Sequence, residues 1–303
     1  MKTRYRHSYH WNVLKLAGCL SAMLFVVPAR GDEPDAGAPV AAQPPPPPSD
    51  NWPGILKMPD REDWTAPGLK PKYATDDHVK LVGIAQQCSD RLASAQWRQD
   101  ILSQLEADAH FDNCSFDEGI AYINKLQTEI DTLVGKSVAK PSDQQVTAAA
   151  DLIGRALHGI QDFYSHTNYV ELMSAKGESF DEKLVIPIWT QAGTLRVQAL
   201  VSKNEAGVVG PSGLVSGIVW WNGPKHCAKD VKPHAELAKD SEQMPSGKKP
   251  LKTWNMSGYR ASYQLADWAT RQFLRHVYET WPALRKRCGG SISYLNMVDR
   301  RSP

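Results

Sequence analysis

The sequence has no excess of charge of either sign, no internal repeat and no apolar run long enough to span a bilayer comfortably. Lysine and arginine together number 35, against 33 for aspartate and glutamate, so charge neither demands nor excludes a nucleic-acid partner. Hydrophobic residues make up 42% of the 303 positions. That share allows a sizeable core and argues against a disordered chain.

The first 31 residues have the layout of a secretory signal. A cationic stretch, MKTRYRHSYHWNVLK, precedes the apolar LAGCLSAMLFVV, and small residues follow at Ala29 and Gly31. This order predicts export to a periplasm or out of the cell, with cleavage after Gly31. LAGC at 16–19 also resembles the bacterial lipoprotein processing box, which would anchor the chain at Cys19. We favour simple cleavage, because the apolar run continues well beyond Cys19.

Few cysteines remain after such cleavage, namely Cys88, Cys114, Cys227 and Cys288. An even number in an exported protein predicts two disulfides, and three pairings are possible. We favour Cys88 with Cys114 and Cys227 with Cys288, because each pair then closes a loop within one half of the chain. The alternative is that the thiols are free and buried.

Composition divides the chain after the signal. Residues 32–51 are rich in proline, alanine and glycine, with five consecutive prolines at 44–48. They are expected to form a disordered, extended linker. No second shift in composition follows, so residues 52–303 are expected to form one domain.

Helical periodicity dominates that domain. Apolar spacing predicts one or two amphipathic helices over 74–109, another over 115–134 and a last one over 257–281. SDQQ, just after Pro141, is a plausible N-terminal cap for a further helix. Residues 184–224 differ, because their β-like segments LVIPIW, LRVQALV and GLVSGIVWW are interrupted by proline and glycine. The predicted fold is therefore mainly α: a helical bundle with an irregular or β-like insertion around 184–224.

GRALHGIQDFYSHTNYVEL, residues 154–172, places His158, Asp162 and His166 at successive steps of four in a segment suited to burial. On an α-helix each step rises about 6 Å and turns about 40°, so the three side chains span about 12 Å. Metal–ligand bonds are about 2 Å long, so the two imidazoles cannot easily reach one ion. The spacing favours two ions, with Asp162 serving either or bridging both. The alternative is that His–Asp pairs only stabilise the helix.

Other histidines and aspartates could complete two such sites. His78 follows two aspartates, ADAHFDN contains His110 and Asp112, and KHCAKDVKPHAELAKDS contains His234 and Asp240. Each could also be an ordinary polar residue of a helix end or loop. Imidazole and carboxylate ligands favour zinc over manganese or iron, and a zinc site needs three or four protein ligands.

These motifs resemble a known family. LIGRALHGIQDFYSHTNYVEL is similar to the hallmark helix of the heterokaryon-incompatibility (Het-C) domain, which itself resembles the N-terminal region of certain von Willebrand factor A-domain proteins. AHFDNCSFDEGIAYI, GLVSGIVWWNGPKHC and HAELAKDS agree in order, so the resemblance covers about residues 75–280. Such domains are more distantly similar to the zinc-dependent phospholipase C and single-strand nuclease superfamily, whose all-helical members hold three zinc ions.

The resemblance implies two or three zinc ions in this chain. The implied ligands are His78, His110, His158, Asp162, His166, His234 and Asp240. Asp162 would bridge two ions, and His166 would hold the second ion together with His234 and Asp240.

The first functional hypothesis is a secreted, zinc-dependent phosphodiesterase similar to phospholipase C. In it Asp162 bridges the ions, and a carboxylate such as Asp112 or Asp100 positions the attacking water. Phospholipid, at a membrane surface, is the preferred substrate; nucleic acid comes second, since the near-neutral charge offers no strong phosphate-binding patch. Tryptophans of the irregular region could enter a membrane interface, unless they pack in the core. They are Trp189, Trp220, Trp221 and Trp254.

The second hypothesis is a non-catalytic toxin-like or surface-interaction module with a structural or incomplete metal site. The enzymes of the superfamily begin with a tryptophan whose amino group and carbonyl bind zinc. Here the predicted mature chain begins with a proline-rich arm, and Trp52 or Trp64 would become terminal only after a second cleavage. An aspartate ligand expected upstream of His110 has no clear counterpart, the candidates being Asp90, Asp100 and Asp108.

Overall fold

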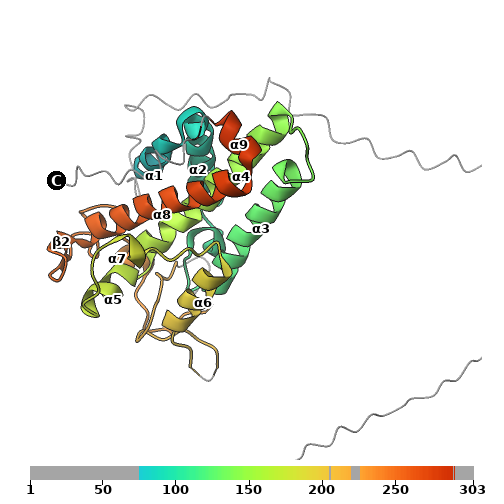
Figure 1. The fold of residues 1–303 in the computed structure, drawn as a ribbon. Coiled ribbons are helices and arrows are strands. Elements are labelled where there is room, and N and C mark those ends of the chain that lie inside the picture. Colours follow the sequence, from blue (N-terminus) through green and yellow to red (C-terminus); the bar gives the residue numbers. More distant parts are fainter. Residues whose placement is uncertain (1–74, 205, 220–225, 289, 291–303) are drawn as a thin grey trace, which may run out of the picture. The chain divides into compact units, whose positions relative to one another are not determined.

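The computed structural model describes residues 75–204, 206–219, 226–288 and 290, all within one compact unit, Trp64–Pro303. The expected signal at 1–31 and linker at 32–51 lie outside the described residues. The described residues are mostly helical, as predicted (Figure 1). Their helices are α1 (Thr75–Val82), η2 (Gly83–Cys88), α2 (Ser89–Leu102), η3 (Ala107–His110), α3 (Phe116–Val134), α4 (Asp143–His166), α5 (Tyr169–Ala175), η4 (Glu182–Leu184), α6 (Gln191–Leu200), α7 (His234–Leu237), α8 (Gly258–Thr280) and α9 (Pro282–Arg287).

Helix α4 is the centre of the bundle and packs against α2, α3 and α8 (Figure 1). Its start is the predicted cap: the backbone N–H of Gln145 donates to Ser142 Oγ, and that of Ser142 donates to Gln145 Oε1. Every residue at 156–167 is buried. The helix therefore carries its histidines and aspartate into the interior rather than along a solvated face.

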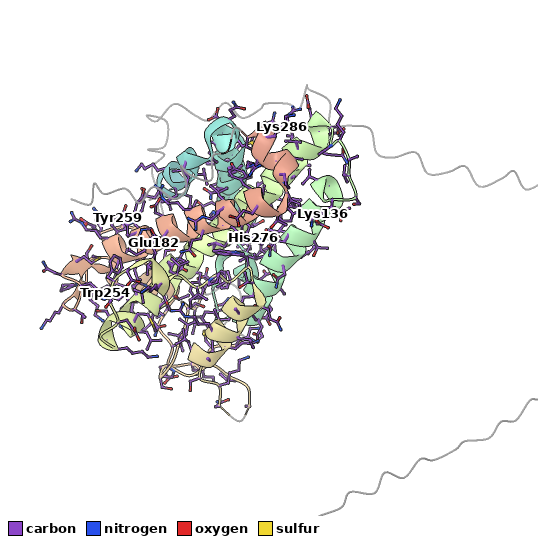
Figure 2. All side chains as sticks on the ribbon, in the orientation of Figure 1. Lys136, Glu182, Trp254, Tyr259, His276 and Lys286 are labelled. Carbon is purple, nitrogen blue, oxygen red and sulfur yellow. A yellow bond between two sulfur atoms is a disulfide. The ribbon has the colours of Figure 1, made fainter. Side chains whose placement is uncertain are left out.

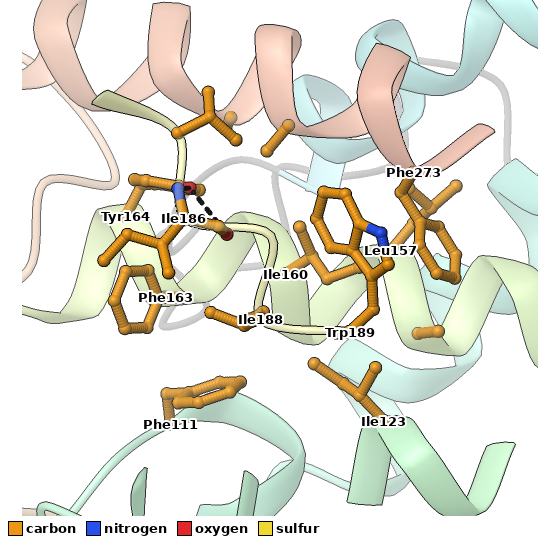
Figure 3. Close-up of a cluster of buried hydrophobic side chains, with 14 of the residues drawn as sticks. Phe111, Ile123, Leu157, Ile160, Phe163, Tyr164, Ile186, Ile188, Trp189 and Phe273 are labelled. Carbon is orange, nitrogen blue, oxygen red and sulfur yellow. Dashed lines mark hydrogen bonds between the residues drawn. The ribbon is translucent and has the colours of Figure 1, made fainter. Parts of the chain in front are cut away.

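An apolar cluster surrounds α4 (Figure 3). In this view Ile160 and Phe163 of α4 lie close to the segment 186–189, and Phe273 of α8 lies close to Trp189. The Trp189 and Phe273 ring centroids are 5.3 Å apart. Burying each large apolar side chain is worth about 1.5–3 kcal/mol, so this cluster fixes where α4 lies.

Two of the tryptophans expected at a membrane interface are core residues instead. Trp189 is 6% exposed and Trp254 is 9% exposed. Trp254, labelled in Figure 2, donates its Nε1–H to the Glu178 carbonyl at 2.7 Å, which satisfies its one polar group. The interfacial expectation is therefore wrong for both side chains. Trp220 and Trp221 lie outside the described residues.

A close approach between α2 and α4 depends on Gly154. A Cβ atom at this position would lie 2.6 Å from Ala95 Cβ and 2.7 Å from the Leu92 carbonyl oxygen. Any larger residue would push α2 away from α4. The glycine thus lets the first half of α2 pack closely against the middle of α4.

The region 184–224 is irregular where it is described, except for α6. In its described residues, strand-like backbone pairing is limited to isolated β-bridges, such as the one between Lys203 and Val209. LRVQALV was expected to be β-like or irregular, but most of it forms α6, and that expectation is wrong. Thr190 Oγ1 accepts from the Gly193 N–H at 3.1 Å and caps the helix, while Val197 is buried. The two-stranded sheet, β1 (Pro250–Leu251) with β2 (Met256–Ser257), lies further along the chain.

Two disulfides are present, as predicted, but the favoured pairing is wrong. Cys88 bonds to Cys288, and Cys114 bonds to Cys227. The end of η2 meets the residue after α9, since the backbone N–H of Gln87 donates to the Cys288 carbonyl, so nearness along the chain is a poor guide to pairing. Two disulfides are compatible with an exported protein. Among the described residues, no helix is both long enough and apolar enough to cross a membrane.

Candidate metal centre

A first group of possible metal ligands lies at the middle of α4. His158 and Asp162 are one turn apart there and meet His78 of α1, with one ligand atom from each within 4.8 Å of the others. His78 Nε2 is 3.2 Å from Asp162 Oδ1, and His158 Nε2 is 3.1 Å from Asp162 Oδ2. All three side chains are buried. The group could hold one metal ion.

His110 reaches the same carboxylate from η3. Its Nδ1 lies 2.8 Å from Asp162 Oδ2 and 3.2 Å from His158 Nε2. Its other nitrogen, Nε2, donates to the Ser103 carbonyl at 3.2 Å. The first group therefore has a fourth nitrogen within reach, from a segment far from α4 in sequence.

A second group lies at the end of α4, where His166 meets Asp112 and His234. Asp112 Oδ1 is 2.8 Å from His234 Nδ1 and 3.6 Å from His166 Nδ1. Asp240 adds a second carboxylate, 3.4 Å from His166 Nε2 and 3.6 Å from His234 Nε2. Asp162 Oδ1 is 3.7 Å from His166 Nε2, so Asp162 lies between the two groups. All eight residues predicted for the site thus converge.

The segment that carries Asp112 has an unusual backbone. Phe111, Asn113 and Cys114 all have φ near +55°, in the left-handed region. Such a conformation costs of order 1–3 kcal/mol for each non-glycine residue, so the surrounding structure must hold it in place. Its consequence is that His110 and Asp112, two residues apart, face the two different groups.

Contacts with the segment 216–219 hold that backbone. Asn113 donates its N–H to the Gly217 carbonyl at 2.9 Å and accepts from the Val219 N–H at 2.8 Å. Gly217 in turn lies against His234, because a Cβ at Gly217 would be 2.4 Å from His234 Cα. The disulfide from Cys114 to Cys227 adds a covalent bond between this backbone and a residue further along the chain. The second group is therefore positioned by loop contacts and a covalent bond.

Asp240 is positioned by the buried Lys239 beside it. Lys239 Nζ donates to the Thr167 carbonyl at 2.5 Å and lies 3.3 Å from Glu171 Oε2. Burial lowers the pKa of Lys239, although Glu171 opposes the shift. A lysine at this place satisfies carbonyls at the C-terminal end of α4 and sets Asp240 beside His166. No pattern in the sequence indicates this role.

Three of the histidines use one ring nitrogen to fix their orientation. His78 Nδ1 lies 2.5 Å from Gln161 Oε1, and His166 Nδ1 lies 3.0 Å from the His110 carbonyl. His110 does the same through the contact of its Nε2 with the Ser103 carbonyl. In each of these three histidines the other ring nitrogen faces a carboxylate, as in metal-binding histidines. Gln161, held by Thr270 at 2.9 Å, was missed by the sequence reasoning. A polar residue next to Asp162 in a buried segment was the available signal.

Several buried polar atoms of the two groups make no hydrogen bond. They are Asp162 Oδ1, both carboxylate oxygens of Asp240, His158 Nδ1 and His234 Nε2. Buried polar atoms are normally paired, so such a cluster calls for a missing partner. Carboxylate oxygens and imidazole nitrogens at this spacing suit a cation.

Opposite charges set the pKa values of the second group. Burial is the largest single effect and would lower the pKa of His234, but the Asp112 and Asp240 carboxylates together outweigh it and raise the value to about 9. His166 likewise has a pKa well above its ordinary value, because Asp162, Asp240 and Asp112 outweigh burial. Burial would raise the pKa of Asp240, yet His166 and His234 hold it well below its ordinary value. In the absence of metal, protons on His166 and His234 therefore supply the positive charge that faces these carboxylates.

The first group is electrostatically different. Burial lowers the pKa of His158 to about 4, against the attraction of Asp162. For His78 the balance is reversed, because Asp162 outweighs burial and the pKa is raised. Asp162 itself has a pKa well below its ordinary value, since the histidines around it outweigh its own burial. At neutral pH His158 is therefore a neutral ligand, ready to bind a cation without losing a proton.

A cavity of about 30 Å³ opens onto both groups. Besides predicted ligands it is lined by Asp100 of α2, by Gln104 in the loop that follows α2, and by Val219. A volume of this size holds one or two water molecules and is far below the roughly 300–1,000 Å³ of typical small-molecule sites. Gln104 lies in a loop without a recognisable pattern, so the sequence could not indicate it.

Comparison with known proteins gives one match. A family model described as the VWA7 N-terminal domain matches residues 84–187, about a third of the chain. The matched stretch contains His110, Asp112, His158, Asp162 and His166, but the remaining candidate ligands lie outside it. No curated protein and no solved structure matches the chain. The chain is thus similar to that domain over its central helices.

Proposed function

We propose that this protein is an exported, zinc-dependent phosphodiesterase of the phospholipase C type. The observation that carries the proposal is the position of Asp162. This buried carboxylate faces His78, His110 and His158 at 2.8–3.2 Å and His166 at 3.7 Å, and its Oδ1 makes no hydrogen bond. A carboxylate between two sets of nitrogens is the arrangement that a bridged pair of ions requires.

The donor sets are each large enough for a zinc ion. The first would consist of His78, His110, His158 and Asp162, and the second of Asp112, His166, His234 and Asp240. Four nitrogen and oxygen ligands are the usual number for zinc. Asp112, which the sequence suggested as a water-positioning residue, takes a ligand position here because it lies between His166 and His234. Two ions, rather than three, are supported by these sets.

Bound zinc would supply Lewis acidity to a phosphodiester and lower the pKa of water towards 7. The chain supplies the rest. Asp100 lines the cavity from α2 and is the carboxylate that remains to orient water. The small cavity cannot enclose a whole substrate, so the bulk of a substrate stays outside. Phospholipid remains the preferred substrate and nucleic acid the second, given the near-neutral charge.

A second function is favoured by the size of the cavity. About 30 Å³ accommodates ions and a water molecule, which would also suit a purely structural metal centre. The protein would then be a non-catalytic toxin-like or surface-interaction module. Metal content and turnover, measured together, separate the two functions.

The test is elemental analysis of the purified mature protein combined with the substitution Asp162→Asn. We expect two zinc ions per chain in the wild type. Asp162→Asn should lose zinc and should no longer hydrolyse a chromogenic phosphodiester, while its helicity by circular dichroism stays unchanged. Asp151→Asn, the same change on the outer face of α4, is the matched control because its pair with Arg98 is at the surface. Unchanged turnover in Asp162→Asn, or a wild type with zinc and no turnover of any diester, would reject the enzyme.

A further inference from the structure

Three exposed aliphatic side chains lie within five residues of the chain, at and just after the end of α2. Ile101 is 49% exposed, Leu102 74% and Leu105 64%. Among the described residues only Leu195, on α6, is a comparably exposed large hydrophobic side chain. Large aliphatic side chains exposed as a group mark a contact surface more often than single ones do. We call Ile101, Leu102 and Leu105 the α2 patch.

The α2 patch borders the metal centre. Asp100 and Gln104, which line the cavity, alternate in sequence with the three exposed side chains. The Ser103 carbonyl accepts from His110 at 3.2 Å, so the backbone of the same segment touches a candidate ligand. Whatever covers the α2 patch therefore lies at the mouth of the cavity.

Size and charge distinguish between the partners that could cover it. Three partly exposed side chains offer far less than the roughly 800 Å² per partner that a stable protein–protein interface buries. They suffice for shallow insertion among lipid chains, which needs apolar area but no shape complementarity. Residues 100–108 contain Asp100, Glu106 and Asp108 and no basic residue. This acidic border disfavours anionic lipid and suits a surface whose outermost group is cationic.

We propose that the α2 patch inserts into a zwitterionic phospholipid surface, such as phosphatidylcholine, and brings the metal centre to the headgroup layer. The proposal rests on the proposed function for its choice of a lipid. It adds the surface that makes contact, which the buried Trp189 and Trp254 do not provide. A cavity too small for a whole lipid needs such contact, because only a phosphate at the membrane surface can reach it.

The experiment measures sedimentation of the purified mature protein with phosphatidylcholine vesicles, in excess chelator so that turnover cannot consume them. We expect the wild type to bind. Leu102→Ser with Leu105→Ser should weaken the partition constant at least about tenfold, since each buried leucine contributes more than that when fully transferred. Leu195→Ser, an equally exposed leucine on α6, is the matched control and should bind as the wild type does. Melting temperature and zinc content confirm that each variant is folded.

Four results would overturn the proposal. They are absent binding by the wild type, equal binding by the double variant, stronger binding to phosphatidylserine-containing vesicles than to phosphatidylcholine, and a wild-type dimer that the double variant abolishes. The last would assign the α2 patch to a second copy of the chain. Vesicle binding without turnover of any diester would instead reject the phosphodiesterase while leaving the lipid contact standing, so the two failures are distinguishable.

Discussion

The two groups of candidate ligands are built by different means. The first takes His158 and Asp162 from one face of α4, with His78 and His110 brought to it by α1 and η3. The second takes only His166 from α4, at its last residue. Its other members lie in the strained loop after η3 and in the irregular chain around α7. Helix packing positions the first group, whereas loop hydrogen bonds and the disulfide from Cys114 to Cys227 position the second.

This difference extends to charge. His158 is deeply buried among helices, and its pKa falls to about 4, whereas His234 lies among carboxylates, and its pKa rises to about 9. The first group therefore has an uncharged ligand ready at neutral pH, and the second must release protons before it binds a cation. Breaking the supports of each group separately should reveal both differences.

Removing the disulfides should have the largest effect. Cys88 and Cys288 are 200 residues apart, and Cys114 and Cys227 are 113 apart. In the loop-entropy account, replacing either pair by alanine lowers the free energy of unfolding by about 5 kcal/mol, nearly the same for both. Only the variant lacking Cys114 and Cys227 should also lose zinc from the second group. Urea unfolding and zinc content of the folded fraction check both statements.

The variant lacking Cys88 and Cys288 is the control for that experiment, because its disulfide joins the end of η2 to the residue after α9, and neither of these segments carries a candidate ligand. If both variants keep the same zinc content, the disulfide from Cys114 to Cys227 does not support the second group. If both lose all zinc, the two groups depend on the fold as a whole and the comparison between them fails.

The pH dependence of stability should differ in direction between the groups. For metal-free protein, the raised pKa of His234 contributes stability that is fully present below about 6.5 and is lost as the pH rises through about 9. The lowered pKa of His158 acts in the opposite direction: its contribution is present above about 6.5 and is lost as the pH falls towards 4. His166 adds to the alkaline loss, because its pKa is also raised.

Melting temperatures between pH 4 and 10, in excess chelator, test this. His234→Gln should flatten the alkaline side without removing it, since His166 remains. His158→Gln should flatten the side between pH 6.5 and 4 and leave the alkaline side unchanged. The same pH profile in both variants would show that the two groups titrate as one unit and not as described.

The sequence was informative where the structure is periodic. Steps of four in a buried helix indicated that His158, Asp162 and His166 share a face, and the Ser142 cap followed from its local pattern. Neither inference needs knowledge of distant contacts, because helix geometry alone fixes the spacing. The helical fold of the bundle could be predicted for the same reason.

The remainder depended on contacts between distant segments. The disulfide pairing was wrong because the end of η2 meets the residue after α9, far along the chain. LRVQALV is helical because Thr190 caps α6 and because Val197 is buried in the core. The position of Asp112 depends on three residues with positive φ, which have no signature in the sequence. Gln161 was only partly predictable. The sequence indicated its neighbour Asp162 as a candidate ligand, but it did not indicate the contact of Gln161 with His78.

Replacing Gln161 tests the first group alone, and its expected effect is smaller than the effects predicted above. Gln161→Leu removes the acceptor at 2.5 Å from His78 Nδ1, so His78 is no longer oriented towards Asp162. Loss of such an outer partner weakens metal binding about 10–100-fold. Gln127→Leu is the matched control, because Gln127 bonds to His276 at 3.0 Å on the far part of α8 (Figure 2). Zinc titration against a competing chelator should show that one of the two sites is weakened. Equal weakening of both sites would mean that His78 supports the second group as well.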